Sequence, residues 1–218
     1  MGDQTRTQSS RTYRKRKRAA AELLTRERIT RATVEMHETV GPAGTTVKAI
    51  AELAGVQRAT VYRHFPDAQQ LFDACTALYF SRHPMPDPRA WSQIPAPRER
   101  LSQALADLYA WYGQTEQMIS NSIRDIDKVP AATAEGFLGY FAEIRAVLMG
   151  GRAERGRPRT RVSAAIGHAI AFPTWHSLVR EQGLRDAEAV ALLAAMIDAA
   201  GATGAQLTAP AQRGPKPI

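Results

Sequence analysis

The chain has 218 residues, of which 44% are hydrophobic and 23% are charged, a balance typical of a globular protein with a buried core. Its single cysteine, Cys75, excludes an internal disulfide framework and a cysteine-rich metal site. The longest apolar run, residues 189–197, is far shorter than the roughly 20 residues of a membrane-spanning helix. We therefore expect a cytoplasmic protein that enters no membrane and carries no metal or other cofactor.

Positive charge is concentrated toward the N-terminus. Residues 1–70 hold 13 Lys and Arg against 7 Asp and Glu, whereas residues 71–218 hold 16 against 14. A basic segment joined to a nearly neutral body is the distribution expected of a nucleic-acid-binding protein. Basic tails that bind membranes or only add solubility produce the same asymmetry, so charge alone does not choose between them.

The first 20 residues are polar and strongly basic and offer little to bury, which predicts a flexible arm. From about Thr25 onward, apolar side chains recur at helical spacing until Gly41 and Pro42 end the helix. Thr45 or Thr46 can then cap a second helix. The N-terminal region is thus a basic arm followed by packed helices.

The second helix is predicted to end at Gly55, and a third runs from about Gln57 to Phe65. A fourth, residues 69–81, precedes a proline-rich loop, because repeated prolines deny a helix its hydrogen bonds. The remaining pattern predicts helices near residues 98–114, 116–127, 131–149, 159–182 and 186–202, with a basic loop at 150–158 and a kink at Pro173.

No strand-like alternation and no internal repeat appears in the sequence, so we predict an all-α fold. The arm occupies residues 1–20, a compact three-helix domain residues 21–70, and a larger helical domain residues 71–203. The tail 204–218 is rich in Ala, Gly and Pro, a composition that predicts disorder.

Residues 45–65 have the design of a helix-turn-helix. The small side chains of Ala51 and Ala54 let two helices cross closely, and Gly55 tolerates the positive φ of a tight turn. Val56 closes the corner between the helices. The outer face of the following helix is then free to enter a DNA major groove.

This stretch resembles the DNA-binding motif of the TetR family of transcriptional regulators, in which Ile-Ala and Ala-Gly-Val precede Tyr-x-His-Phe at fixed spacing. The matching positions are Ile50, Ala51, Ala54, Gly55, Val56, Tyr62, His64 and Phe65, with Leu71 at the place of a downstream Leu. The resemblance covers about residues 25–75. It implies an N-terminal helix-turn-helix DNA-binding domain and a C-terminal helical ligand-binding and dimerisation domain.

Two positions depart from the family pattern. Gln57 stands where the family usually has Ser or Thr to cap the recognition helix, and Ala68 stands where it usually has a Lys that contacts a phosphate. One lost phosphate contact lowers the slope of log affinity against log salt by about 0.9. The basic arm offers replacement contacts.

By resemblance, Thr45 or Thr46 and Tyr62 contact phosphates of the DNA. The base-facing set implied by the family is Arg58, Ala59, Thr60, Arg63 and His64. Arg58 or Arg63 can donate two hydrogen bonds to the O6 and N7 atoms of guanine. We therefore expect a guanine in each half-site of the operator. Ala59, on the same recognition helix, can touch a thymine methyl.

Two interpretations of the basic arm stay open. Its cations either contact the minor groove or the phosphates, as other DNA-binding arms do, or form a solvated tail. The arm residues assigned to DNA are Arg14, Arg16 and Arg18.

The resemblance also implies a homodimer that binds a palindromic operator and a small-molecule effector. The apolar faces expected to pair two subunits lie on the last two helices, at Val162, Ile166, Ala169, Ile170, Ala189, Leu192, Leu193, Met196 and Ile197. Candidate ligand-binding residues are Trp111, Tyr112, Met118, Asn121, Phe137, Tyr140, Phe141, His168, Phe172 and Trp175. Polar groups expected to orient a ligand are Asn121, Arg124, His168 and His176.

The function implied is a repressor that a ligand releases from its operator. One alternative is a constitutive or architectural DNA-binding protein without a ligand, and another is a helical enzyme. The sequence has no phosphate loop, dinucleotide-binding Gly motif, nucleophile elbow or paired His with an intervening Glu. We therefore expect no enzyme activity and no catalytic residues.

Overall fold

The computed structural model describes residues 3–202, and their side chains from Tyr13 onward. Every regular element within residues 3–202 is helical, which confirms the predicted all-α class. The tail predicted to be disordered, residues 204–218, lies outside the described residues. None of the described helices is both long and apolar enough to cross a membrane.

The chain forms two compact units. The first contains residues up to Pro86 together with Trp111–Tyr140, and the second contains Asp87–Ala110 and the chain from Phe141 onward. Of the three boundaries, 86/87 falls in a loop, and 110/111 and 140/141 fall inside helices, whereas the sequence suggests a single division at residue 70. The compact units defined by packing therefore combine segments that are not consecutive in the chain.

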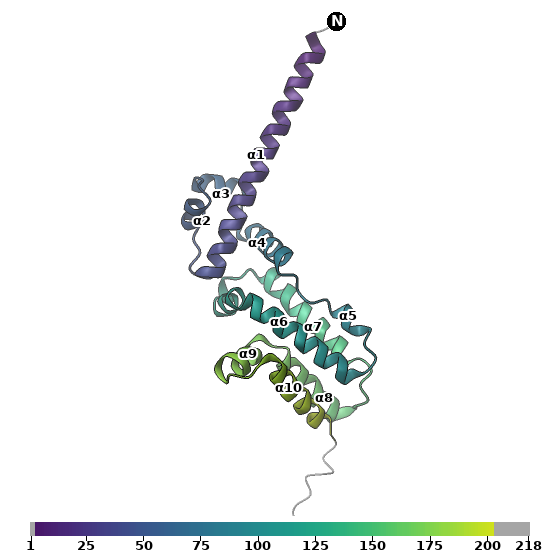
Figure 1. The fold of residues 1–218 in the computed structure, drawn as a ribbon. Coiled ribbons are helices and arrows are strands. Elements are labelled where there is room, and N and C mark those ends of the chain that lie inside the picture. The colour runs from purple at the N-terminus through teal and green to yellow at the C-terminus, as the bar shows by residue number, and fades with distance from the viewer. Residues whose placement is uncertain (1–2, 203–218) are drawn as a thin grey trace, which may run out of the picture. The chain divides into compact units, whose positions relative to one another are not determined.

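The first unit includes the helix-turn-helix. Its elements are α1 (Asp3–Thr39), α2 (Val47–Leu53), α3 (Arg58–His64), α4 (Ala68–Arg82), the second part of α6 (Pro97–Arg124), the short turn η1 (Ile126–Lys128) and the first part of α7 (Ala131–Met149). Figure 1 shows α2 and α3 beside the C-terminal half of the long helix α1.

Helix α1 begins at Asp3 rather than near Thr25, so the segment predicted as a flexible arm is helical from Asp3. The physical reason is that no Gly or Pro interrupts residues 3–40, and Arg, Lys, Ala and Leu, which are good helix formers, follow one another at 14–24. The first helix is therefore longer than the stretch with apolar periodicity.

Two buried clusters hold the first unit together. The helix-turn-helix core consists of Ile29, Ala32, Ile50, Ala51, Ala54, Val61 and Phe65. A second cluster joins α1, α4 and α6 through Val34, Cys75, Tyr79 and Met118. Because α1 contributes to both, it is the common support of the DNA-binding motif and of the helices that follow it.

The second unit contains the helices that were expected to form the dimer. Its elements are α5 (Pro88–Ser92), the first part of α6, the end of α7, α8 (Gly156–Ala169), α9 (Phe172–Trp175), the π-helical turn η2 (His176–Glu181) and α10 (Asp186–Gly201). Helix α5, inside the proline-rich loop, was not predicted. Pro88 sits in its first turn, where a helix needs no amide hydrogen.

Two predicted breaks differ from the structure. Helix α6 is continuous from Pro97 to Arg124, where the sequence predicts two helices, because Gly113 is tolerated inside it. Conversely, the helix predicted over residues 159–182 ends at Ala169. Pro173 then stands in the first turn of the new helix α9, so it starts a helix instead of kinking one.

The apolar faces of α8 and α10 pack mainly on each other. Of the nine residues expected at a dimer interface, all except Leu192 and Met196 are buried within the subunit. Burial inside one chain removes those seven from an interface with another. After the first turn of α10, its exposed residues form a different face, which consists of Ala191, Leu192, Ala195, Met196 and Ala199.

Candidate nucleic-acid interface

Helix α2 is capped by Thr46, whose hydroxyl oxygen accepts a 3.1 Å hydrogen bond from the amide of Ala49. The neighbouring Thr45 hydroxyl donates to the carbonyl of Gly41 at 2.8 Å. The hydroxyl hydrogen of Thr45 is therefore used within the protein. That of the exposed Thr46 has no acceptor among the described residues and is available to a phosphate.

The turn between α2 and α3 has the geometry that the sequence predicts. Gly55 has a φ of 63°, in the left-handed region that favours glycine. The amide of Val56 donates to the carbonyl of Ala51 at 2.9 Å, which closes the turn. Ala51 and Ala54 are buried, so the small side chains lie at the helix crossing as expected.

The outer face of α3 is exposed and basic. Arg58, Ala59, Tyr62 and Arg63 are exposed, and their spacing places them on one side of the helix. On the opposite side, Val61 is buried in the core of the motif. The structure thus brings four of the residues assigned to DNA onto one accessible face.

Two other residues of the predicted base-facing set are less accessible. Thr60 and His64 are half-buried, and Nε2 of His64 is buried without a hydrogen-bond partner among the described residues. Burial, together with the nearby charges of Arg63 and Arg26, lowers the pKa of His64. This shift favours the neutral form of the His64 ring.

The two departures from the family pattern are visible in the structure. Gln57 precedes α3, and its side chain makes no capping hydrogen bond. Ala68 is exposed at the start of α4. The N-terminal end of α4 is capped by Asp67, whose carboxylate accepts a 2.8 Å hydrogen bond from the main-chain amide of Gln70. Helix α4 therefore has a side-chain cap, whereas the recognition helix α3 has none.

The basic arm presents its charges in all directions. Arg14, Arg16 and Arg18 are exposed on α1, as are Lys15 and Lys17 between them. Consecutive helical residues are about 100° apart, so five neighbouring cations surround the helix axis. One of them is partly neutralised, because Arg18 lies 3.4 Å from Glu22.

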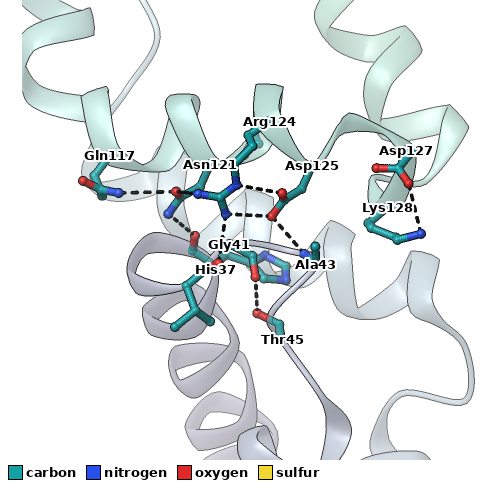
Figure 2. A network of polar contacts seen from close by, with 12 residues as sticks. His37, Gly41, Ala43, Thr45, Gln117, Asn121, Arg124, Asp125, Asp127 and Lys128 are labelled. Atoms are coloured by element: carbon teal, nitrogen blue, oxygen red, sulfur yellow. Dashed lines mark hydrogen bonds and ion pairs between the residues drawn. The ribbon is translucent and has the colours of Figure 1, made fainter.

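Asn121, which was predicted to contact a ligand, bonds to the end of α1. Its amide nitrogen donates to the carbonyls of His37 and Glu38 at the end of α1, at 3.1 and 2.7 Å, and its side chain is buried. These carbonyls lie in the last turn of α1, where main-chain acceptors have no partner in the helix. Asn121 thus caps α1 from α6 (Figure 2), and its amide hydrogens are not available to a ligand.

Arg124 and Asp125 extend this capping to the loop that leads into α2 (Figure 2). Arg124 donates to the carbonyl of Val40 at 2.9 Å and pairs with Asp125 at 2.8 Å, and Asp125 accepts from the amide of Ala43 at 3.0 Å. The Arg124 guanidinium and the Ala43 amide lower the pKa of Asp125. We call Asn121, Arg124 and Asp125 the α6 clamp.

Sequence reasoning missed the α6 clamp because its members bond to main-chain groups more than 80 residues away. Such contacts leave no spacing signal. The one local signal is Gly41, whose φ of 85° favours glycine and whose missing Cβ leaves room for Arg124 and Asp125.

The predicted ligand-binding residues are divided between the two units. Trp111, Tyr112, Met118, Phe137 and Tyr140 belong to the first unit, and Phe141, His168, Phe172 and Trp175 belong to the second. The structure therefore does not gather them within one unit. In the first unit, Phe80 joins two of them, with ring centroids 6.2 Å from Trp111 and 5.7 Å from Phe137.

The polar atoms of several of these residues bond within the protein. The Tyr140 hydroxyl donates to the carbonyl of Pro86 at 2.8 Å, and the Trp175 indole donates to Asp186 at 3.0 Å. His168 is exposed on α8, and the Thr174 hydroxyl donates to its carbonyl. Among residues 3–202, no three His, Cys, Asp or Glu side chains are grouped to hold a metal ion.

Comparisons with known proteins agree with this geometry. Residues 29–75 match the family model of the bacterial regulatory proteins of the tetR family. No curated protein matches the chain. A helix-turn-helix with an exposed basic recognition face is the arrangement typical of a DNA-binding transcriptional regulator. Residues 29–75 are thus similar to the DNA-binding domain of that family.

Three solved structures share the fold at low sequence identity. A protein of Clostridium perfringens described as a fatty acid metabolism regulator is 16% identical, with a TM-score of 0.57 over 81% of this chain and 98% of that one. A HlyIIR mutant protein is 17% identical, with a TM-score of 0.52 over 78% and 93%. A TetR-family regulator from Rhodococcus sp. is 18% identical, with a TM-score of 0.50 over 82% and 99%.

Proposed function

We propose that the protein is a homodimeric repressor that binds a palindromic operator in the cytoplasm and is released from it by a small-molecule effector. The observation that carries the proposal is the outer face of α3, where Arg58, Ala59, Tyr62 and Arg63 are exposed on a helix whose other face is buried. Guanidinium groups on such a face can donate paired hydrogen bonds to guanine.

The exposed face of α10 supports the homodimer. Leu192 and Met196 are 42% and 53% exposed, and Ala191, Ala195 and Ala199 lie between and beside them. A continuous apolar row of this kind is buried when a second copy of the same face packs on it, and the alanines allow close approach. Two subunits then present two recognition helices to two half-sites about 34 to 36 Å apart.

The aromatic group around Phe80, Trp111 and Phe137 supports an effector site in the first unit. Pockets for small molecules are mostly lined by such side chains. The dimer can adopt one conformation whose recognition helices are spaced to fit the operator and another whose spacing does not fit. An effector that binds the second conformation more tightly than the first lowers the affinity for DNA by the ratio of its two affinities. A regulator without an effector is the alternative.

Footprinting across a salt series tests the DNA-binding part of this proposal, first on the DNA upstream of the gene and then on sites selected from random DNA. We expect protection of a palindrome and a steep fall of affinity with salt. Arg58→Ala should make the protein insensitive to replacement of the half-site guanine, whereas the control Arg89→Ala, an exposed arginine of α5, should not. Equal sensitivity of the parent and Arg58→Ala would show that Arg58 does not contact the guanine.

Removal of residues 1–18 tests the arm. If Arg14, Arg16 and Arg18 contact phosphates, the truncated protein should bind the operator more weakly and with a smaller salt slope. An unchanged affinity and slope would identify a solvated tail. A screen for compounds that release the operator distinguishes the effector-controlled repressor from the constitutive alternative.

A further inference from the structure

The recognition helix is short and is weakly held at its N-terminal end. Helix α3 has seven residues, and Gln57, which precedes it, donates and accepts no side-chain capping bond. The first amides of a helix have no partner in the helix, so a missing cap leaves that end free to fray. Besides its buried face, a second contact holds the helix in place.

That contact comes from α1 at the other end of α3. Nη1 of Arg26 donates a 2.6 Å hydrogen bond to the main-chain carbonyl of His64, the last residue of α3. The same guanidinium lies over the ring of Phe65, with its central carbon 4.0 Å from the ring centroid. Phe65 is 3% exposed in the core of the motif, so it is a rigid platform for the guanidinium.

Both interactions favour arginine over lysine. A planar guanidinium can stack on an aromatic ring while it donates in its own plane, whereas an ammonium group offers no flat face. A positive charge at the C-terminal end of a helix is also favoured by the helix dipole. Arg26 thus ties the end of α3 to the helix that supports the whole motif.

We propose that Arg26 is a positioning residue for operator recognition, which sets how α3 presents Arg58 and Arg63 to the bases through its contacts with His64 and Phe65. The inference rests on the proposed sequence-specific binding of DNA. Paired hydrogen bonds to base edges require accurate placement of the helix, while phosphate contacts depend mainly on charge. Loss of Arg26 therefore weakens recognition of sequence more than it weakens attraction to DNA.

The test compares affinity for the selected operator with affinity for a scrambled duplex of equal length, at several salt concentrations. The main variant is Arg26→Lys, which keeps the charge. Arg26→Gln removes it, and Arg31→Gln is the matched control, since Arg31 lies exposed on α1 and pairs with Glu27. A third change, Gln57→Ser, supplies the missing cap of α3.

We expect Arg26→Lys to lower operator affinity about tenfold, the effect of one lost charge-assisted hydrogen bond. Affinity for the scrambled duplex and the salt slope should stay near the parent values. Arg31→Gln should leave the ratio of operator to scrambled affinity unchanged. Gln57→Ser, added to Arg26→Gln, should restore part of that ratio, because it fixes the same helix from its other end.

Parent-like operator affinity of Arg26→Lys would overturn the inference. So would an equal loss on operator and scrambled DNA by a variant whose helical circular dichroism matches the parent, since that result identifies a phosphate contact. If the parent itself prefers no sequence, the proposed function fails and the inference fails with it. A parent that selects an operator, combined with a parent-like Arg26→Lys, overturns the inference alone.

Discussion

Arg124, the last residue of α6, donates a 2.9 Å hydrogen bond to the main-chain carbonyl of Val40, just beyond the end of α1. The two residues are 84 positions apart in the chain. With Asn121 and Asp125, Arg124 satisfies main-chain groups that the end of α1 leaves without partners. The α6 clamp therefore stabilises the loop from which the helix-turn-helix begins.

Gly41→Ala should lower the free energy of unfolding by about 2 kcal/mol or more, because a φ of 85° strains alanine and the new Cβ overlaps Arg124 and Asp125. Urea denaturation measures the change. The control is Gly136→Ala in α7, where a Cβ meets nothing within 4 Å. That variant should gain about 0.5 to 1 kcal/mol, because alanine favours the helix. Equal effects of the two substitutions would contradict the role of Gly41.

Acid should destabilise the protein through His37. Burial lowers the pKa of His37 to about 4 in the folded state, whereas an unfolded histidine titrates near 6.5. Below about pH 6.5 the unfolded chain binds a proton that the folded protein excludes, so stability falls as pH falls, by up to about 1.4 kcal/mol per pH unit until about pH 4. Urea titrations of the parent and His37→Gln across this range measure the effect.

His37→Gln removes that titration, so its stability should change less with pH in the same window. The ring of His37 lies 4.7 Å from Phe72 and its Nδ1 atom 3.4 Å from the Cys75 sulfur, so the variant also loses packing at every pH. Only the difference in slope reports the proton. Identical slopes for the two proteins would show that His37 is not held neutral.

Thr46→Ala should weaken both the fold and the binding of DNA. Loss of the hydrogen bond from the Ala49 amide costs about 1 kcal/mol of stability. Loss of the exposed hydroxyl removes a phosphate contact, so operator and scrambled DNA should be bound more weakly in equal proportion. Thermal unfolding and DNA titrations measure the two effects. Thr46→Ser keeps the hydroxyl and should behave like the parent in both.

Substitution of Leu192 and Met196 together by Asp should prevent formation of the proposed dimer, because each subunit would bury two charges in the α10 face. Light scattering coupled to size-exclusion chromatography measures the mass. Leu138→Asp is the control, since Leu138 is 70% exposed on α7 and lies in the other unit. An unchanged mass of the double variant would exclude this face as the dimer interface.

The helix-turn-helix was predictable from residues 45–65 because its determinants are local. The periodic apolar positions, the small residues at the crossing and Gly55 act within one or two helical turns of each other. The fourth and seventh helices were also predictable in outline. The ends of helices were harder to predict, since a proline such as Pro173 can either kink a helix or begin one, and in the structure it stands at the start of α9.

The sequence by itself thus determined the helical class and the DNA-binding motif, including the missing cap at Gln57. Tertiary structure alone decided that Asn121 caps α1, that Arg26 holds the end of α3, and that most of the apolar residues expected at the dimer interface on α8 and α10 are buried within one subunit. The reason is physical. These roles are hydrogen bonds and contacts with groups distant along the chain, and many of the partners are main-chain atoms, which every residue type carries.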